Sequence, residues 1–142
     1  MQNRISRNAY ISYKAYIFGV FMLTEQYSVV FNGFNTDFYT TDYIANIWGV
    51  SANEVYEETG IYIPGIIHEG YLVDEKIVDG LGKQVYMVVS TRNPTEPTKK
   101  EDYWDSYREV IRRVRGRLEN PSMSISKNVT DFYYFLDIEY VD

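Results

Sequence analysis

The stretch TKKEDYWDSYREVIRRVRGRL, residues 98–118, constrains the fold most strongly. Its apolar side chains recur every three or four residues, which places them along one side of a helix. They are Tyr103, Tyr107, Val110, Ile111, Val114 and Leu118. Acidic residues occupy the first turns and arginines the last, an order that the helix dipole favours. We therefore predict one long amphipathic helix over residues 99–118, with Thr98 as its cap and Glu101 as the partner in a capping box.

Strand patterns occur on both sides of this helix. Residues 71–78 and 83–91 are rich in apolar and β-branched side chains, and the turn signal Asp79-Gly80 separates them, so we predict a hairpin. Residues 129–142 alternate between apolar and acidic side chains, which predicts a half-buried antiparallel strand. Its inward positions would be Leu136, Ile138 and Tyr140.

The segment before the hairpin combines a strand with helices. Residues 26–31 predict a strand, because four of the six are aromatic or β-branched. Residues 43–48 and 51–58 predict two short helices, since Gly49 interrupts the helical pattern between them. The chain then returns to strand patterns, in which Glu69-Gly70 is expected as a turn.

The N-terminal residues admit two interpretations. Apolar side chains over residues 4–24 follow a helical stripe, and we predict a helix there, although the apolar run over residues 16–23 also suits a strand. That run is too short to span a membrane, and no small-x-small cleavage site follows it. We expect a retained terminus that packs against the rest of the chain.

These elements predict an α+β protein with a small, mostly antiparallel sheet and a long amphipathic helix. Residues 1–25 would form an N-terminal helix or arm, residues 26–74 a βααβ segment, and residues 75–142 a hairpin strand, the long helix and a final strand. The chain has 142 residues, a length typical of one domain, so we expect the three segments to share one compact unit.

Composition narrows the range of functions. The 14 Lys+Arg and 20 Asp+Glu residues give a net charge of −6, which disfavours free nucleic acid and anionic membranes as partners. Without cysteine, the chain has no disulfides, no thiolate nucleophile and no cysteine-based zinc site. The 15 tyrosines suit half-exposed sheet faces and protein interfaces, where a ring is partly apolar and partly solvated.

No set of residues in the sequence matches a known catalytic or metal-binding pattern. His68 is the single histidine, and no nucleophile elbow or phosphate-binding loop accompanies it. The acidic residues Glu54, Glu57 and Glu58 have the spacing of the solvated face of a short helix. The sequence therefore predicts a protein that is not an enzyme, and that holds neither a metal nor a cofactor.

Arginines gather in the last turns of the predicted long helix, and we consider them a candidate partner interface. They are Arg108, Arg112, Arg113, Arg115 and Arg117. Arg108, Arg112 and Arg115 share one face and suit an acidic partner surface or phosphates. The alternative is a solvated face balanced by Asp102 and Asp105. The functional interpretation is that these arginines contact acidic residues of another subunit.

Residues 26–74 resemble a LysM module. The residues that carry the resemblance are Ile44, Ala45, Trp48, Gly49, Val50, Ser51, Gly60 and Pro64. The resemblance implies a βααβ fold, and members of this family bind N-acetylglucosamine-containing glycans or serve as structural pieces of bacteriophage tails. A helix-turn-helix is the other interpretation of this segment, but three glutamates on its second helix would oppose DNA phosphates.

Residues 83–142 are similar in their order of elements to bacteriophage tail-terminator and tail-completion proteins. The two resemblances together imply a non-enzymatic structural subunit of the virion, in its tail, neck or baseplate. Its partners would be other virion proteins and copies of itself, and it would be made in the host cytoplasm. Two alternatives are a peptidoglycan-binding module, with a glycan as partner, and a small regulator that binds a host protein.

Overall fold

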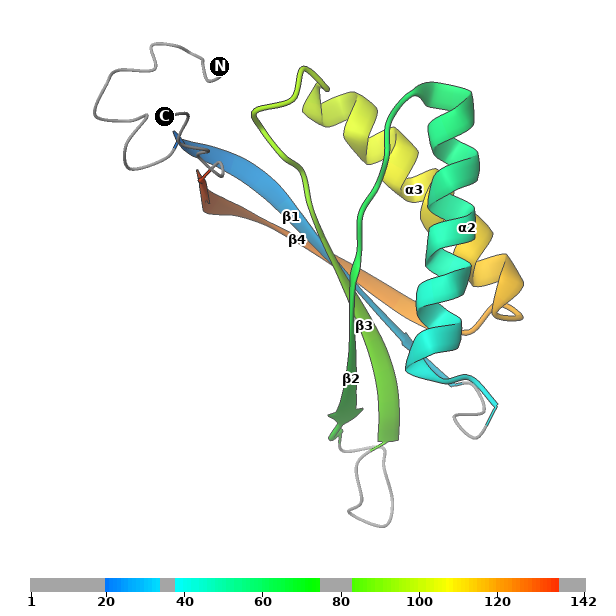
Figure 1. Cartoon of the computed structure of the whole chain (residues 1–142). Helices are drawn as coiled ribbons and strands as arrows, with labels where there is room; N and C mark the ends of the chain where they lie inside the picture. Colours follow the sequence, from blue (N-terminus) through cyan, green and yellow to red (C-terminus); the bar gives the residue numbers. More distant parts are fainter. Residues whose placement is uncertain (1–19, 34–37, 75–82, 136–142) are drawn as a thin grey trace, which may run out of the picture.

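The computed structural model describes residues 20–33, 38–74 and 83–135. It shows a mixed α/β fold with a four-stranded antiparallel sheet and two helices, which lie together on one side of the sheet (Figure 1). The order along the chain is β1 (Val20–Asn32), α2 (Thr41–Thr59), β2 (Ile66–Leu72), β3 (Lys83–Thr91), α3 (Lys100–Arg117) and β4 (Ser122–Tyr134). The order across the sheet is β2-β3-β1-β4.

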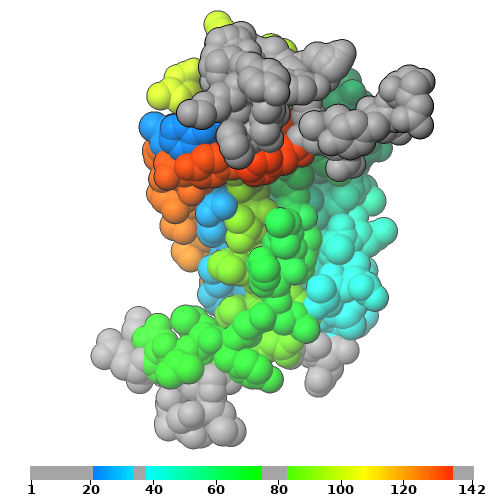
Figure 2. Space-filling model, turned by 60° about the vertical axis from the view of Figure 1, so that its left-hand side comes forward, coloured from blue at the N-terminus to red at the C-terminus, as the bar shows by residue number. Residues whose placement is uncertain are grey.

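Strand β1 organises the sheet because it pairs on both edges. It pairs with β4 along its whole length, from Val20 opposite Tyr134 to Asn32 opposite Ser122. Figure 2 shows the start of β1 and the end of β4 side by side at one end of the molecule. The second half of β1 also pairs with β3, and β3 pairs with β2. Side chains alternate along a strand, so every second residue of β1 from Tyr27 onward is buried beneath the helices.

Helix α2 is continuous, and the prediction of two short helices is wrong. Its N-terminus is capped by Thr40, whose hydroxyl accepts a hydrogen bond from the backbone N–H of Tyr43 at 3.2 Å. It ends at Gly60, which adopts the left-handed conformation with φ of 77°. Gly49 lies in the interior of the helix. A single glycine costs only about 1 kcal/mol there, and burial of the apolar face offsets it.

Helix α3 is confirmed, together with its predicted stripe. The side chains from Tyr103 to Leu118 that the periodicity selects are all buried. The predicted capping box is wrong, because the N-cap residue is Lys99 and no side chain caps this end. The backbone carbonyl of Thr98 instead accepts a hydrogen bond from Arg92 at 3.2 Å.

Three strand boundaries differ from the prediction. Strand β2 begins five residues before the predicted 71–78, and the expected turn at Glu69-Gly70 lies inside it. Strand β4 begins at Ser122 rather than at residue 129, and residues 20–24, predicted as helix, form the start of β1. Cross-strand pairing lengthens β1 and β4 together and overrides local propensity. The remaining predictions, for residues 4–19, 75–78 and 136–142, lie outside the described residues.

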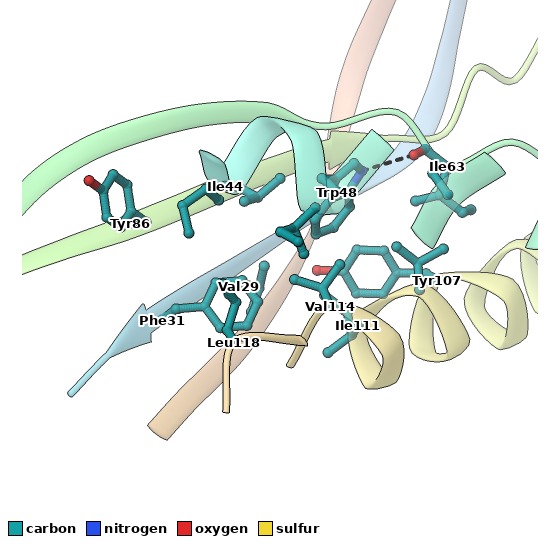
Figure 3. Close-up of a cluster of buried hydrophobic side chains, with 14 of the residues drawn as sticks. Val29, Phe31, Ile44, Trp48, Ile63, Tyr86, Tyr107, Ile111, Val114 and Leu118 are labelled. Atoms are coloured by element: carbon teal, nitrogen blue, oxygen red, sulfur yellow. Dashed lines mark hydrogen bonds between the residues drawn. The ribbon is translucent and has the colours of Figure 1, made fainter. Parts of the chain in front are cut away.

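The core lies between the two helices and the sheet (Figure 3). Trp48 of α2 is at its centre, and its indole N–H donates to the backbone carbonyl of Ile63 at 3.0 Å. Gly65, two residues later, lies where the chain passes so close to Trp48 that a side chain has no room. The loop from α2 to β2 is therefore fixed against the core.

Two buried tyrosines of α3 provide a matched test of this core. Tyr103 shares a hydrogen bond of 2.7 Å with Ser90, whereas the hydroxyl of Tyr107 has no partner within the described residues. Burial raises the pKa of Tyr103 to about 12, and it raises that of Tyr107 as well. We expect Tyr103→Phe to lower the free energy of unfolding by about 1–3 kcal/mol, because Ser90 loses its partner. Tyr107→Phe should be neutral or stabilising by up to about 1 kcal/mol.

Chemical denaturation of the two variants checks this prediction. Equal losses of stability in both would contradict it, since only one of the two hydroxyls is hydrogen-bonded in the structure.

Candidate functional site

The predicted arginine interface lies along α3, and part of it faces α2. Arg113 donates to Glu109 at 2.7 Å and reaches across to Glu58 at 2.8 Å and Glu54 at 3.4 Å. Arg117 binds Glu54 at 2.7 Å and the Ser51 hydroxyl at 2.8 Å. Glu54 and Glu58, expected on a solvated face, thus join the two helices.

The other three arginines bind residues that are near them in the sequence. Arg108 pairs with Asp105 at 2.6 Å and lies 5.3 Å from the centre of the Trp104 ring. Arg112 pairs with Glu109, and Arg115 donates to the backbone carbonyl of Pro121 at 2.9 Å. All five arginines therefore have partners in their own chain. Their role as an interface stays a prediction.

The ion pairs of the α3 arginines, within α3 and with α2, predict a dependence of the free energy of unfolding on pH. Hydrogen bonds from Arg112 and Arg113 lower the pKa of Glu109 from 4.5 to about 2, and Arg117 lowers the pKa of Glu54. A lowered folded-state pKa stabilises the fold above the unfolded pKa, and this contribution is lost as the pH falls through the folded value. We expect Tm to fall between pH 4.5 and 2, with a shallower fall in Glu109→Gln. Identical slopes in the two proteins would contradict this assignment.

The other residues singled out by the sequence are spread over the fold. Ile44, Trp48 and Ser51 are buried on α2, while Ala45 and Val50 are exposed on it. His68 lies on β2 opposite Met87, and its side chain points to the face of the sheet that lacks helices. The structure does not bring His68 together with the glutamates of α2.

A different group of polar side chains does converge, and we call it the Tyr39 network: Tyr39, Glu69, Tyr86 and Glu119. The hydroxyl of Tyr86 donates to the backbone carbonyl of Tyr39 at 2.8 Å and lies 3.4 Å from the Glu69 carboxylate. The hydroxyl of Tyr39 donates to Glu119 at 2.9 Å. The network thus joins β2, β3, the segment before α2 and the turn after α3.

Pairing in the sheet explains the first half of the network. Glu69 and Tyr86 are directly opposite each other on β2 and β3, with their side chains on the same face. Gln84 donates a further hydrogen bond to Glu69 at 3.1 Å. Tyr86 is buried while Glu69 is exposed, so the Glu69 carboxylate lies at the surface beside a hydroxyl of the core. Figure 3 shows the Tyr86 hydroxyl pointing away from the centre of the core.

A hollow of about 500 Å³ adjoins the second half of the network. It is lined by Gly33, Phe38, Tyr39, Leu118, Glu119, Asn120, Pro121 and Ser122. Glu119 and Asn120 have positive φ values of 65° and 57°, which a glutamate adopts at a cost in backbone energy. Such strain is commonly retained at functional sites. Here it accompanies a carboxylate that is hydrogen-bonded to Tyr39.

Aromatic rings and carboxylates give this region its chemistry. Phe38 is 65% exposed, and it packs edge-on against Tyr39 with ring centres 4.9 Å apart. Burial and the neighbouring carboxylates raise the pKa of both Tyr39 and Tyr86, so both phenols remain proton donors at neutral pH. Two anions beside exposed aromatic faces favour a ligand that carries positive charge and a flat ring.

The sequence missed this network because its members are far apart in the chain. Tyr39 and Glu119 are separated by 80 positions, and Glu69 and Tyr86 by 17. The available signal was the alternation of β2, which places the charged Glu69 on the same face as Ile67. A charge on the face that packs toward helices is unusual and marks a residue with a specific partner.

No group of three or more His, Cys, Asp or Glu side chains within residues 20–33, 38–74 and 83–135 is placed to hold a metal ion. No helix in those ranges is long and apolar enough to cross a membrane.

Comparison with known families gives a match over most of the chain. The family model for SAM lyase matches residues 22–136. No curated protein matches the sequence.

Similar solved structures include two of a phage SAM lyase. One, in complex with S-methyl-5'-thioadenosine, is 10% identical, with a TM-score of 0.49 over 78% of this chain and 90% of that chain. The other, in the apo state, is 11% identical, with a TM-score of 0.45 over 82% and 92%. A PII-like signalling protein from Thermus thermophilus is 9% identical, with a TM-score of 0.38 over 80% and 92%.

The family match corrects the interpretation of the sequence. The LysM resemblance of residues 26–74 is wrong, and its expected βααβ segment is replaced by one continuous helix between strands that are not neighbours in the sheet. The resemblance of residues 83–142 to tail-terminator proteins is wrong as well. So is the prediction of a non-enzymatic virion subunit, because the family that matches is one of enzymes.

Proposed function

The chain belongs to the SAM lyase family, and from this premise we propose that it degrades S-adenosylmethionine. The observation that supports the proposal is the family match over residues 22–136, which includes all six described helices and strands except the first residues of β1. The expected products are S-methyl-5'-thioadenosine and a four-carbon fragment.

The chemistry of the substrate defines what the protein must do. Its sulfonium sulfur is joined to a methyl group, to adenosine and to the γ-carbon of the methionine portion. Cleavage of the bond to the γ-carbon leaves the electron pair on sulfur, which becomes a neutral thioether. A lyase adds no water, so the bond that the γ-carbon loses must be replaced by a bond to another atom of the substrate.

We propose that the substrate's own carboxylate attacks the γ-carbon and closes a five-membered lactone. The new C–O bond replaces the C–S bond, and the negative carboxylate and positive sulfonium cancel, so atoms and charge balance without a co-reactant. Intramolecular attack needs only a folded substrate held in the right geometry. Charge is lost in the transition state, so a weakly polar surface around the sulfur favours the reaction over the bound ground state.

The Tyr39 network is the proposed site of this reaction. The exposed faces of Phe38 and Tyr43 offer a weakly polar surface for the adenine and the sulfonium. Glu119 is held in place by the hydrogen bond from Tyr39, and Glu69 by the hydrogen bond from Gln84. Carboxylates held in this way bind ribose hydroxyls or the substrate ammonium. Their function would be to bind and orient the substrate, not to transfer a proton.

Product analysis tests the proposed activity. Purified protein incubated with S-adenosylmethionine should release S-methyl-5'-thioadenosine in proportion to enzyme concentration, as measured by liquid chromatography with mass detection. Release of S-adenosylhomocysteine or adenine instead would indicate another reaction. No consumption of substrate would contradict the proposal.

A further inference from the structure

A second hollow lies at the opposite end of α3 from the Tyr39 network, and we call it the α3 groove. It has a volume of about 480 Å³. It is lined by Glu25, Tyr27, Lys100, Glu101, Trp104, Ile125, Lys127 and Val129. Figure 1 shows that α3 runs along β1 and β4, so the helix forms one wall and these two strands form the floor. The proposed active site has no part in it.

The two hollows are lined by different residues, and no residue belongs to both. On β4, Ser122 of the other hollow and Ile125 of the α3 groove are three residues apart, roughly 10 Å at about 3.3 Å per residue. We therefore treat the α3 groove as a site with a lining of its own.

The interior of the α3 groove is aromatic and apolar. Trp104 stacks on the buried Tyr27, with ring centres 5.3 Å apart and planes at 22°. Ile125 and Val129 are on the helix-facing side of β4, and Val129 is 60% exposed. Arg108 lies over the Trp104 ring at 5.3 Å, so the apolar surface offered to a ligand is formed by Trp104 together with Ile125 and Val129.

The walls of the groove are held rigidly. The Glu25 carboxylate forms an ion pair of 2.7 Å with Arg92, and both side chains are largely buried. Arg92 also donates to the carbonyl of Thr98, just before α3 begins. The hydroxyl of Thr24 donates to the Arg92 carbonyl at 2.6 Å. The start of α3 is thereby fixed against β1, as a preformed binding site requires.

Charges of both signs surround the aromatic surface without partners in the described chain. Lys100, Glu101 and Lys127 form no hydrogen bond or ion pair through their side chains with any residue in the ranges 20–33, 38–74 and 83–135. This contrasts with the five arginines of α3, each of which is bonded within the chain. Two ammonium groups and a carboxylate are thus available to a ligand.

We propose that the α3 groove binds a zwitterionic amino acid that carries a flat ring system. The ring packs against Trp104 and Val129, the ligand carboxylate binds Lys100 and Lys127, and the ligand ammonium binds Glu101. This class includes S-adenosylhomocysteine, which has the adenine and the amino-acid group but no sulfonium to cleave. The inference rests on the groove alone and does not depend on the proposed activity.

Nuclear magnetic resonance of the indole N–H groups gives a readout specific to this groove. The chain has two tryptophans, and Trp48 is buried in the core while Trp104 lines the groove. We expect S-adenosylhomocysteine to shift the Trp104 signal in a saturable manner and to leave the Trp48 signal in place. S-methyl-5'-thioadenosine, which lacks the charged groups, should bind there at least tenfold more weakly. No shift of Trp104 would overturn the proposal.

Paired variants distinguish the contribution of the two lysine charges to binding from an effect on the fold. The double variant Lys100→Ala, Lys127→Ala should bind S-adenosylhomocysteine at least tenfold more weakly by the Trp104 signal. Lys99→Ala, which removes a neighbouring charge outside the groove, should bind it normally. Equal affinity in the double variant and the parent would overturn the assignment of the two lysines.

Activity measurements distinguish this inference from the proposed function. The double variant should cleave S-adenosylmethionine within twofold of the parent. A loss of turnover in it, with Glu69→Gln fully active, would place catalysis in the groove and overturn the claim of a second site. A saturable Trp104 shift in a protein that does not cleave S-adenosylmethionine would support the groove and contradict the proposed function.

Discussion

Glu69→Gln is expected to lower kcat/KM for S-adenosylmethionine by about 10- to 100-fold, the effect of removing a hydrogen bond to a charged group of roughly 1.5–3 kcal/mol. Glutamine has the same shape, and its amide oxygen still accepts a hydrogen bond from Gln84, so the local structure is retained. It lacks the negative charge that would bind ribose hydroxyls or the substrate ammonium. Steady-state release of S-methyl-5'-thioadenosine measures the effect.

Glu57→Gln is the matched control. Glu57 is exposed on α2, and it forms no hydrogen bond or ion pair through its side chain with residues that the structure describes. We expect unchanged kinetics and an unchanged Tm in this variant. A normal kcat/KM in Glu69→Gln would remove the Tyr39 network from the reaction. A large fall in Tm with Glu69→Gln would show that the residue acts on the fold instead.

Gly65→Ala is expected to lower the stability of the protein substantially, although it adds only one methyl group. A Cβ atom at this position would lie 2.7 Å from Cγ1 of Val88 and 2.8 Å from the Trp48 ring. Both neighbours are buried, so neither can move without disturbing the core. We expect the free energy of unfolding to fall by about 1–3 kcal/mol, the usual cost of overpacking. Urea denaturation followed by circular dichroism measures it.

Gly49→Ala is the control for this variant, and it should have the opposite effect. Gly49 lies inside α2, and a Cβ atom there would meet nothing within 4 Å. Alanine should therefore stabilise the protein by about 0.5–1 kcal/mol through its higher helix propensity. Loss of stability in Gly49→Ala would contradict the finding that α2 is one continuous helix.

Local sequence patterns correctly predicted helix α3 and strand β3. The stripe from Tyr103 to Leu118 identified α3, and residues 83–91 identified β3 with its exact bounds. Gly49 was misleading, because propensity measures the cost of a helical glycine and not the burial that offsets it. Burial of Trp48 and its neighbours exists only after the sheet has formed.

The proposed site, the Tyr39 network, could not be predicted in the same way. Glu69 gains its partner through the register of β2 against β3, and Glu119 gains its partner through the packing of the segment before α2. Neither contact leaves a short motif in the sequence. The proposed chemistry also needs no nucleophile, histidine or metal from the protein, because the substrate would supply its own leaving group and attacking carboxylate. A search for catalytic motifs therefore finds nothing in such an enzyme.

Isotope labelling of the four-carbon product tests the central claim most directly. The reaction is carried out in water enriched in ¹⁸O, and the product is analysed by mass spectrometry before any lactone can hydrolyse. We expect S-methyl-5'-thioadenosine together with a lactone of unchanged mass, since both lactone oxygens come from the substrate. Initial formation of a homoserine that carries ¹⁸O would show that water attacks the γ-carbon, and it would contradict a lyase reaction.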